Sequence, residues 1–281
     1  MYTIIAALIA IGLIFSLFKT FDTRLLEEIE KNLTIENEYY KTSISSQLEK
    51  KSEIINNLST YMESKRQLNY DELLDYMKAM LNKNSNIESI YFGSTDNLLV
   101  NGSGWIPPED FDLRTRPWYV KAINHGKLVI TDVFLNATSE KHIITIAKPV
   151  YSNKGQVIGV LGADLSLDSI VDLISVQDDS YGEFFILNEE LELIAKSRTQ
   201  DDGKPILEDT SLKISSNISS IGTSVAEATL NNEKGYVSIS KIDGTNLYVG
   251  VFNPIKSYNY YDTQWRNILI ISVIFLVGLL L

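Results

Sequence analysis

Long apolar runs occupy both ends of the chain. Residues 2–18 (YTIIAALIAIGLIFSLF) and residues 268–281 (ILIISVIFLVGLLL) contain no charged side chain. Because about 20 apolar residues in a helix span the hydrocarbon core of a bilayer, we expect a transmembrane helix at 2–18 and the truncated start of a second at 268–281. A signal peptide is disfavoured, since no small-residue cleavage site follows the first run. A buried C-terminal helix is the alternative for the second run.

The segment after the first run has the apolar periodicity of one long helix. Large apolar side chains recur at spacings of three, four and seven. They are Leu25, Ile29, Leu33, Tyr40, Ile44, Leu48, Ile55, Leu58 and Met62. No Gly or Pro interrupts the run, so we predict a continuous helix over residues 20–65. Such a helix suits a stalk or the seam of a homodimer, or it packs along its own domain. We expect it to do both in part.

Strand patterns then replace the helical period and define a first unit over residues 66–176. A helix over residues 70–81, capped by Asn69, opens the unit. The predicted strands occupy residues 87–92, 97–100, 128–134, 142–151 and 156–165, and a helix over 167–174 closes the unit. Turn residues between neighbouring strands, such as Ser-Asn-Lys-Gly after the fourth, predict an antiparallel sheet.

A second unit of the same kind is expected over residues 177–256. Residues 182–197 (GEFFILNEELELIAKS) predict one hairpin, and the Asp243-Gly244 turn between apolar strands predicts another. The stretch between the two hairpins is expected to be helical or irregular. Residues 257–267 are predicted to form a linker helix. The fold class is therefore α+β, with a long N-terminal helix followed by two antiparallel-sheet subdomains and flanked by transmembrane helices.

Composition excludes several classes of protein. The 281 residues carry a formal net charge of −11, which disfavours nucleic acid as a partner because the phosphates would be repelled. The absence of cysteine excludes disulfides, thiolate catalysis and cysteine–zinc sites, and two histidines are too few for a histidine-rich metal site. No phosphate-binding loop or catalytic triad stands out. We therefore expect neither an enzyme nor a cofactor.

The candidate chemistry lies in one short cluster and one isolated acid. Residues 110–122 (DFDLRTRPWYVKA) place Arg116 close to Trp118 and Tyr119, whereas Asp164 interrupts an apolar strand. A guanidinium binds a carboxylate bidentately, and an indole N–H donates one further hydrogen bond. A carboxylate and an aromatic face attract an ammonium group. The plainer alternatives are core packing for the two aromatic residues and helix capping for Asp164.

These landmarks resemble the double Cache (dCache) sensor domains of bacterial transmembrane receptors. RxRPWYxxA at 114–122, KPVY at 148–151 and GADLSL at 162–167 occur in the order that the family has. The resemblance covers nearly all of residues 20–265 and is specific in the first unit. It implies two tandem PAS-like subdomains, of which the first is membrane-distal and binds the ligand.

The resemblance is closest to the dCache subfamily that binds amino acids. Carried onto this sequence, it implies that Arg116 and Trp118 hold the ligand carboxylate. It also implies that Tyr119 and Asp164 hold the ligand amino group.

Three positions depart from that subfamily. Phe111 stands where the family motif has a tyrosine, so one hydroxyl is missing. Phe134 and Asn136 stand where such receptors commonly have Tyr-x-Asp. Asp132 is a candidate for a second carboxylate, or it is a solvated strand end. These departures raise the alternative of an amine, purine-like or carboxylate ligand.

The sequence therefore predicts the extracytoplasmic sensor region of a bacterial signal-transduction receptor. It is expected to bind a small ligand, most readily an amino acid, and to transmit a conformational shift across the cell membrane. The expected partners are the ligand, the membrane and a second copy of the chain. The output module, a chemotaxis coil, a histidine kinase or a diguanylate cyclase, is expected beyond residue 281. An alternative of another class is a ligand-free structural or protein-interaction ectodomain.

Overall fold

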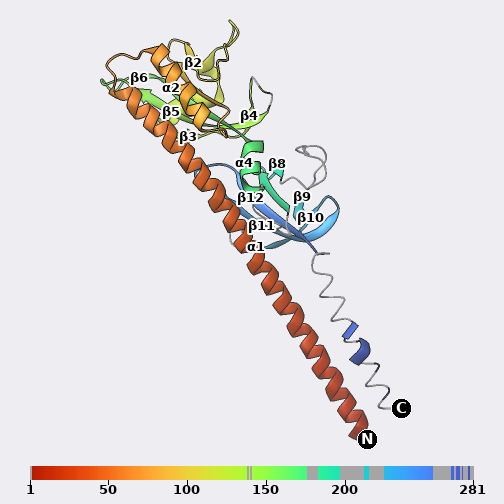
Figure 1. The fold of residues 1–281 in the computed structure, drawn as a ribbon. Coiled ribbons are helices and arrows are strands. Elements are labelled where there is room, and N and C mark those ends of the chain that lie inside the picture. Colours follow the sequence, from red (N-terminus) through yellow and green to blue (C-terminus); the bar gives the residue numbers. More distant parts are fainter. Residues whose placement is uncertain are drawn as a thin grey trace.

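One helix, α1 (Tyr2–Ser64), supports two sheets that lie one after the other along its length (Figure 1). Its 63 residues correspond to about 95 Å at 1.5 Å per residue. The computed structural model describes residues 2–137, 139, 141–175, 183–196, 212–214 and 225–255, and a few positions between 267 and 278.

The predicted linker at 257–267 lies outside the described residues except at residue 267, and more than half of the predicted membrane helix at 268–281 lies outside them. The predicted span at 2–18 lies partly outside the described side chains. Within the described part of the chain, no helix combines the length and the hydropathy that crossing a membrane requires.

The first sheet, sheet A, lies at the end of α1 far from its N-terminus (Figure 1). Its strands are β1 (Ser89–Ser94), β2 (Leu99–Asn101), β3 (Val129–Ile130), β4 (Phe134–Leu135), β5 (His142–Tyr151) and β6 (Val157–Ser166). The order is β2-β1-β6-β5-β3, β4 also pairs with β5, and every pairing is antiparallel. The strand predicted over residues 128–134 is divided in two at residues 131–133. At Thr131 the side-chain hydroxyl, in place of a backbone carbonyl, accepts the Thr145 N–H at 2.9 Å.

Three α-helices accompany sheet A. The predicted helix with its Asn69 cap is confirmed as α2 (Tyr70–Lys83), in which the Asn69 side chain accepts the N–H groups of Asp71 and Glu72. The closing helix is confirmed as α4 (Leu167–Ser175). The third, α3 (Pro117–His125), follows a 3₁₀ turn, η1 (Leu113–Thr115). The strand patterns of the sequence did not predict this helix. Its signals were Pro117 at the first helical position and Gly126 after the end.

The second sheet, sheet B, packs nearer the N-terminal half of α1 (Figure 1). Its strands are β7 (Glu183–Leu187), β8 (Leu193–Lys196), β9 (Leu212–Ile214), β10 (Ala226–Leu230), β11 (Glu233–Lys241) and β12 (Tyr248–Pro254). Their order is β8-β7-β12-β11-β10-β9, and both predicted hairpins are confirmed. The expectation of a helical or irregular stretch between the hairpins was wrong for β9 and β10. In β10, buried Ala228 and Leu230 alternate with Glu227 and Thr229, and the strand pairs with β11.

The apolar stripe of α1 faces both sheets. Leu25 is partly buried and the other predicted stripe positions are buried: Ile29, Leu33, Tyr40, Ile44, Leu48, Ile55, Leu58 and Met62. They belong to a continuous core that includes residues of β5, β6, β7 and β12. The buried Asn37 side chain donates from Nδ2 to the carbonyl oxygens of Ser238 (2.9 Å) and Val249 (3.0 Å). The stripe therefore packs along its own domain, which was one of the two roles expected for this helix; the other was a stalk or the seam of a homodimer.

Candidate ligand-binding site

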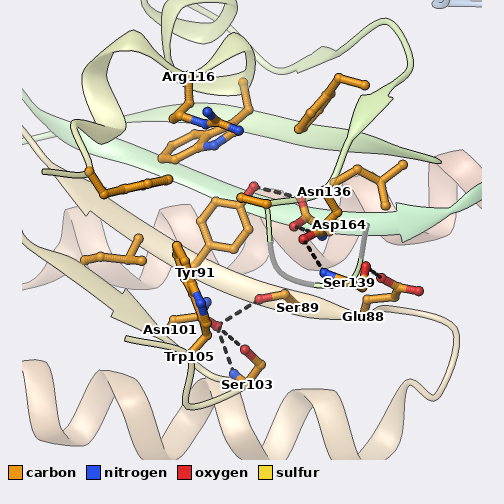
Figure 2. Close-up of a pocket in the computed structure, with 16 residues that line it drawn as sticks. Glu88, Ser89, Tyr91, Asn101, Ser103, Trp105, Arg116, Asn136, Ser139 and Asp164 are labelled. Carbon is orange, nitrogen blue, oxygen red and sulfur yellow. Dashed lines mark hydrogen bonds between the residues drawn. The ribbon is translucent and has the colours of Figure 1, made fainter. Parts of the chain in front are cut away.

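The face of sheet A away from α1 carries a polar patch. Side chains alternate between the two faces of a strand, so Ser89 and Tyr91 of β1 point away from the core that contains Ile90. The strand register places Asp164 of β6 opposite both Ser89 and Thr145. A cavity of about 170 Å³ lies over this patch (Figure 2). The segments from β2 to α3 and around β4 form its other walls.

Asp164 is the buried acid of this cavity, with 6% of its surface exposed. Its Oδ1 accepts hydrogen bonds from the hydroxyls of Tyr91 and Thr145, both at 2.7 Å. Among the described residues, its Oδ2 accepts only a longer bond of 3.4 Å from the Asn136 amide. Burial raises the pKa of Asp164 to about 6, although the two hydroxyl hydrogen bonds oppose the rise. No cation of the described residues forms an ion pair with Asp164, so Oδ2 is available to an ammonium group.

A glycine allows Tyr91 to reach Asp164. Tyr91 lies opposite Gly162 in the register of β1 and β6. A Cβ atom at Gly162 would lie 2.6 Å from the Tyr91 ring, so any larger residue would displace that ring. Burial, together with the negative charge of Asp164, raises the pKa of the Tyr91 hydroxyl well above its ordinary value. Tyr91 therefore remains protonated and donates to Asp164.

The turn before α3 orients Arg116. Asp112 caps η1 and pairs with Arg114 at 2.8 Å, which leaves Arg114 on the outside. Arg116 follows in an extended conformation at the N-terminus of α3, and its guanidinium carbon lies 5.3 Å from the centre of the Phe111 ring. Among the described residues, no carboxylate pairs with Arg116. Figure 2 shows Arg116 at one side of the cavity, with Tyr91 and Asp164 between Arg116 and Ser89.

Six of the eight predicted site residues line the cavity. They are Arg116, Trp118, Asp164, Phe111, Phe134 and Asn136. Trp118 is 5% exposed and stands edge-on to Tyr91, with ring centres 4.9 Å apart. The three positions that depart from the family pattern are thus cavity positions. At two of them the replacement has a visible role, because Phe111 contacts Arg116 through its ring and Asn136 donates to Asp164.

The other two predicted residues lie elsewhere. Tyr119 is buried in the core beside Trp118, since successive residues of a helix point about 100° apart. Asp132 accepts hydrogen bonds from Lys121 Nζ (3.1 Å) and from the Asn246 amide (3.0 Å) of the turn before β12. The structure therefore places neither residue at the cavity.

The sequence reasoning missed the wall opposite Arg116. It is formed by Glu88, Ser89, Tyr91, Asn101, Ser103 and Trp105. For Ser89 and Tyr91 a signal existed, because these two polar positions alternate with Ile90 and Phe92 and so mark a second face of the strand. For the others, the sequence contained no distinctive pattern.

Comparison with known proteins identifies the family. The family dCache_1, described as a Cache domain, matches residues 19–258. The methyl-accepting chemotaxis protein PscA of Pseudomonas syringae pv. tomato is 28% identical over 254 residues, which cover 84% of this chain and 40% of PscA. The methyl-accepting chemotaxis protein PctB of Pseudomonas aeruginosa is 27% identical over 203 residues, 68% of this chain and 31% of PctB. The chain thus spans well under half the length of these relatives.

Solved structures share the fold. The ligand-binding domain of the amino acid chemoreceptor PctB in complex with L-Arg has a TM-score of 0.65 and 23% identity, covering 83% of this chain and 97% of that domain. The ligand-binding domain of Pseudomonas fluorescens chemoreceptor CtaA in complex with L-serine has a TM-score of 0.66 and 21% identity, covering 82% and 99%. At these identities the likeness concerns the fold, and the family match extends over most of the chain. The chain therefore belongs to the dCache family of Cache domains.

Proposed function

We propose that this chain is the extracytoplasmic sensor region of a bacterial chemoreceptor-like protein and that its cavity binds an amino acid. Asp164 Oδ2 receives the ammonium group, and Arg116 receives the carboxylate together with the indole N–H of Trp118. The observation that carries this proposal is the pairing of chemistry in one cavity. A buried carboxylate and a guanidinium both line it, and neither forms an ion pair with the described residues.

The electrostatics of the cavity suit a zwitterion. Opposite charges on two parts of the cavity match the opposite charges of an α-amino acid, and burial strengthens each attraction because the local dielectric is low. The Tyr91 and Trp118 rings add aromatic surface beside the proposed ammonium position. PctB and CtaA, which share the fold, hold L-Arg and L-serine in their solved structures, and this supports the same ligand class here.

An amine without a carboxylate is the second candidate ligand. The observation that favours it is the contact between Arg116 and Phe111, which gives the guanidinium an aromatic partner within the protein. The hydroxyl that the family motif would place at position 111 is absent. An amine would pair with Asp164, and Arg116 would keep its contact with the Phe111 ring.

A thermal-shift screen of the purified chain against amino acids, amines, carboxylates and nucleobases tests the proposal. A ligand at a hundred times its Kd stabilises the fold by about 2.7 kcal/mol. Shifts with amino acids that disappear in both Arg116→Ala and Asp164→Ala support the zwitterion site. Shifts with amines that persist in Arg116→Ala identify an amine sensor. The absence of any shift across these compounds would sink the proposed function in favour of a ligand-free ectodomain.

The proposed signalling path uses α1 and the membrane. We propose that residues 2–18 and 268–281 anchor the chain and that two copies associate along α1. Leu26, Ile35 and Tyr39 support this association, because these apolar side chains of α1 are exposed in the single chain. Ligand binding would then shift the population between two arrangements of the helices, to the extent that the ligand prefers one of them.

A further inference from the structure

We propose that the wall opposite Arg116 selects a ligand with a short, uncharged side chain that carries an oxygen acceptor, such as a carboxamide or a hydroxyl. We call the part of this wall that is formed by Glu88, Ser89, Asn101, Ser103 and Trp105 the selector wall. The inference rests on the proposed function, because it assigns a side-chain preference to the same amino-acid cavity.

Asn101 is the centre of the selector wall, and its orientation is fixed. The residue is 9% exposed. Its Oδ1 accepts hydrogen bonds from Ser89 Oγ (2.8 Å), from the Ser103 N–H (2.9 Å) and from Ser103 Oγ (2.9 Å) (Figure 2). Because the backbone N–H of Ser103 can only donate, the atom at that position must be the oxygen, and the amide nitrogen must occupy the other one. Within the described residues Nδ2 donates to no acceptor, so two N–H groups of a largely buried side chain are offered to the cavity.

Trp105 adds a second donor beside Asn101. Figure 2 shows the two side chains next to each other on the selector wall. The Trp105 ring stands edge-on to Phe111, with ring centres 5.2 Å apart, and this contact holds the indole in place. Its N–H also has no acceptor among the described residues. A ligand oxygen placed here would accept hydrogen bonds from both residues, whereas a hydrocarbon side chain would leave both donors unpaired.

The charges of the wall disfavour an anionic side chain, and its N–H donors disfavour a cationic one. Glu88 pairs with the exposed Lys141 at 3.2 Å and accepts a long bond from Ser139 at 3.5 Å. An anionic side chain would face the carboxylates of Glu88 and Asp164. A cationic side chain has no acceptor to offer to Asn101 and Trp105. A carboxamide satisfies both requirements, because its oxygen accepts and its NH₂ group donates to an acidic wall.

The volume of the cavity is compatible with a short side chain. A buried cavity of about 150 Å³ is sufficient for benzene. The cavity here is about 170 Å³, which is enough to hold a ligand somewhat larger than benzene, such as an amino acid with a few side-chain atoms. The ligand class that meets the donors, the charges and the volume together is a small polar amino acid of the asparagine or serine type.

Titration calorimetry with L-asparagine and L-leucine tests this inference, because the two have the same branching and the same number of non-hydrogen atoms. We expect the purified chain to bind L-asparagine at least about ten-fold more tightly than L-leucine. Asn101→Asp keeps the oxygen that Ser89 and Ser103 need and removes the amide donors, and Trp105→Phe removes the indole N–H. Both variants should reduce the preference several-fold. The Kd of L-alanine, measured on each protein, normalises for changes in the shared ammonium and carboxylate contacts.

The outcomes separate this inference from the proposed function. If amino acids bind and L-leucine binds as tightly as L-asparagine, the selector wall is overturned and the amino-acid site stands. An asparagine preference that persists unchanged in both Asn101→Asp and Trp105→Phe also overturns it. If no amino acid binds to the chain, both proposals fail together.

Discussion

At the residue scale, the ionisation of Asp164 at neutral pH lowers the free energy of unfolding. Its pKa is about 6 in the folded protein, against an ordinary value of 3.8. The folded state therefore favours the protonated acid. That stabilisation is complete below the unfolded pKa, declines as the pH rises through about 6, and is absent at pH 8. A buried carboxylate with no ion-pair partner among the described residues is typical of a ligand-binding site.

Replacement of Asp164 by its neutral isostere should reveal this cost. We expect Asp164→Asn to stabilise the ligand-free chain at pH 8, by on the order of 3 kcal/mol if the whole shift is recovered. The advantage should shrink toward pH 4, where Asp164 itself is protonated. Urea denaturation at the two pH values measures it. A variant that is less stable than the parent at pH 8 would show that the ionised carboxylate supports the fold.

Ligand affinity should depend on pH in the opposite direction. Asp164 must lose its proton before it pairs with an ammonium group, so we expect the Kd of an amino acid to rise about ten-fold per pH unit below about 6. Above pH 7 the Kd should be constant, since the acid is then ionised. Calorimetry between pH 5 and pH 8 gives the profile. A flat profile would mean that Asp164 does not hold the ammonium group, and Asp164→Asn supplies the pH-independent reference.

Residues of an unusual type for their position could be identified from the sequence, whereas their neighbours in the structure could not. Arg116, Trp118 and Asp164 stand out because a cation, an indole and an isolated acid rarely occur in such places without a role. Asn101 does not stand out, since its meaning comes from the three hydrogen bonds that orient it. Tyr119 shows that neighbours in the sequence need not share a site. It follows Trp118 in a helix, so its side chain points in another direction and packs in the core.

At the element scale, periodicity predicted the long segments and failed at the short ones. The stripe of α1 contains many apolar positions in one register, so its buried face was unambiguous. The five residues of β10 alternate over too short a run to be distinguished from a loop, and their pairing with β11 decides the structure. Helix α3 has nine residues, too few for periodicity to identify it, and its remaining signals are Pro117 at the first helical position and Gly126 after the end.

Asn37 attaches α1 to sheet B, and its replacement should weaken that attachment. Asn37→Leu removes the two hydrogen bonds to Ser238 and Val249 and leaves their buried carbonyl oxygens without this donor. We expect a loss of about 2 kcal/mol in the free energy of unfolding, measured by urea denaturation. Asn32→Leu, an exposed asparagine on the same helix, should change stability by less than about 0.5 kcal/mol. Equal effects of the two substitutions would contradict a specific role for Asn37.

At the scale of the whole molecule, one helix and one core connect the cavity-bearing sheet with sheet B. The largest core cluster contains residues of α1, sheet A and sheet B. Asp132 adds a polar link between the two units through Asn246. A change in sheet A therefore has a packed route to α1 and sheet B, which is what the proposed sensor requires of its architecture. The cavity lies on the face of sheet A away from α1, so the route passes through the sheet itself.

The central claim is that the cavity recognises both charged ends of an amino acid. Titration calorimetry of the purified chain tests it most directly, with the amino acid that gives the largest thermal shift, its decarboxylated amine and its deaminated acid. We predict that each single-ended analogue binds at least about a hundred-fold more weakly, because Arg116 or Asp164 is then left without its counter-charge. An amine that binds as tightly as the amino acid would contradict the claim and assign the cavity to amines.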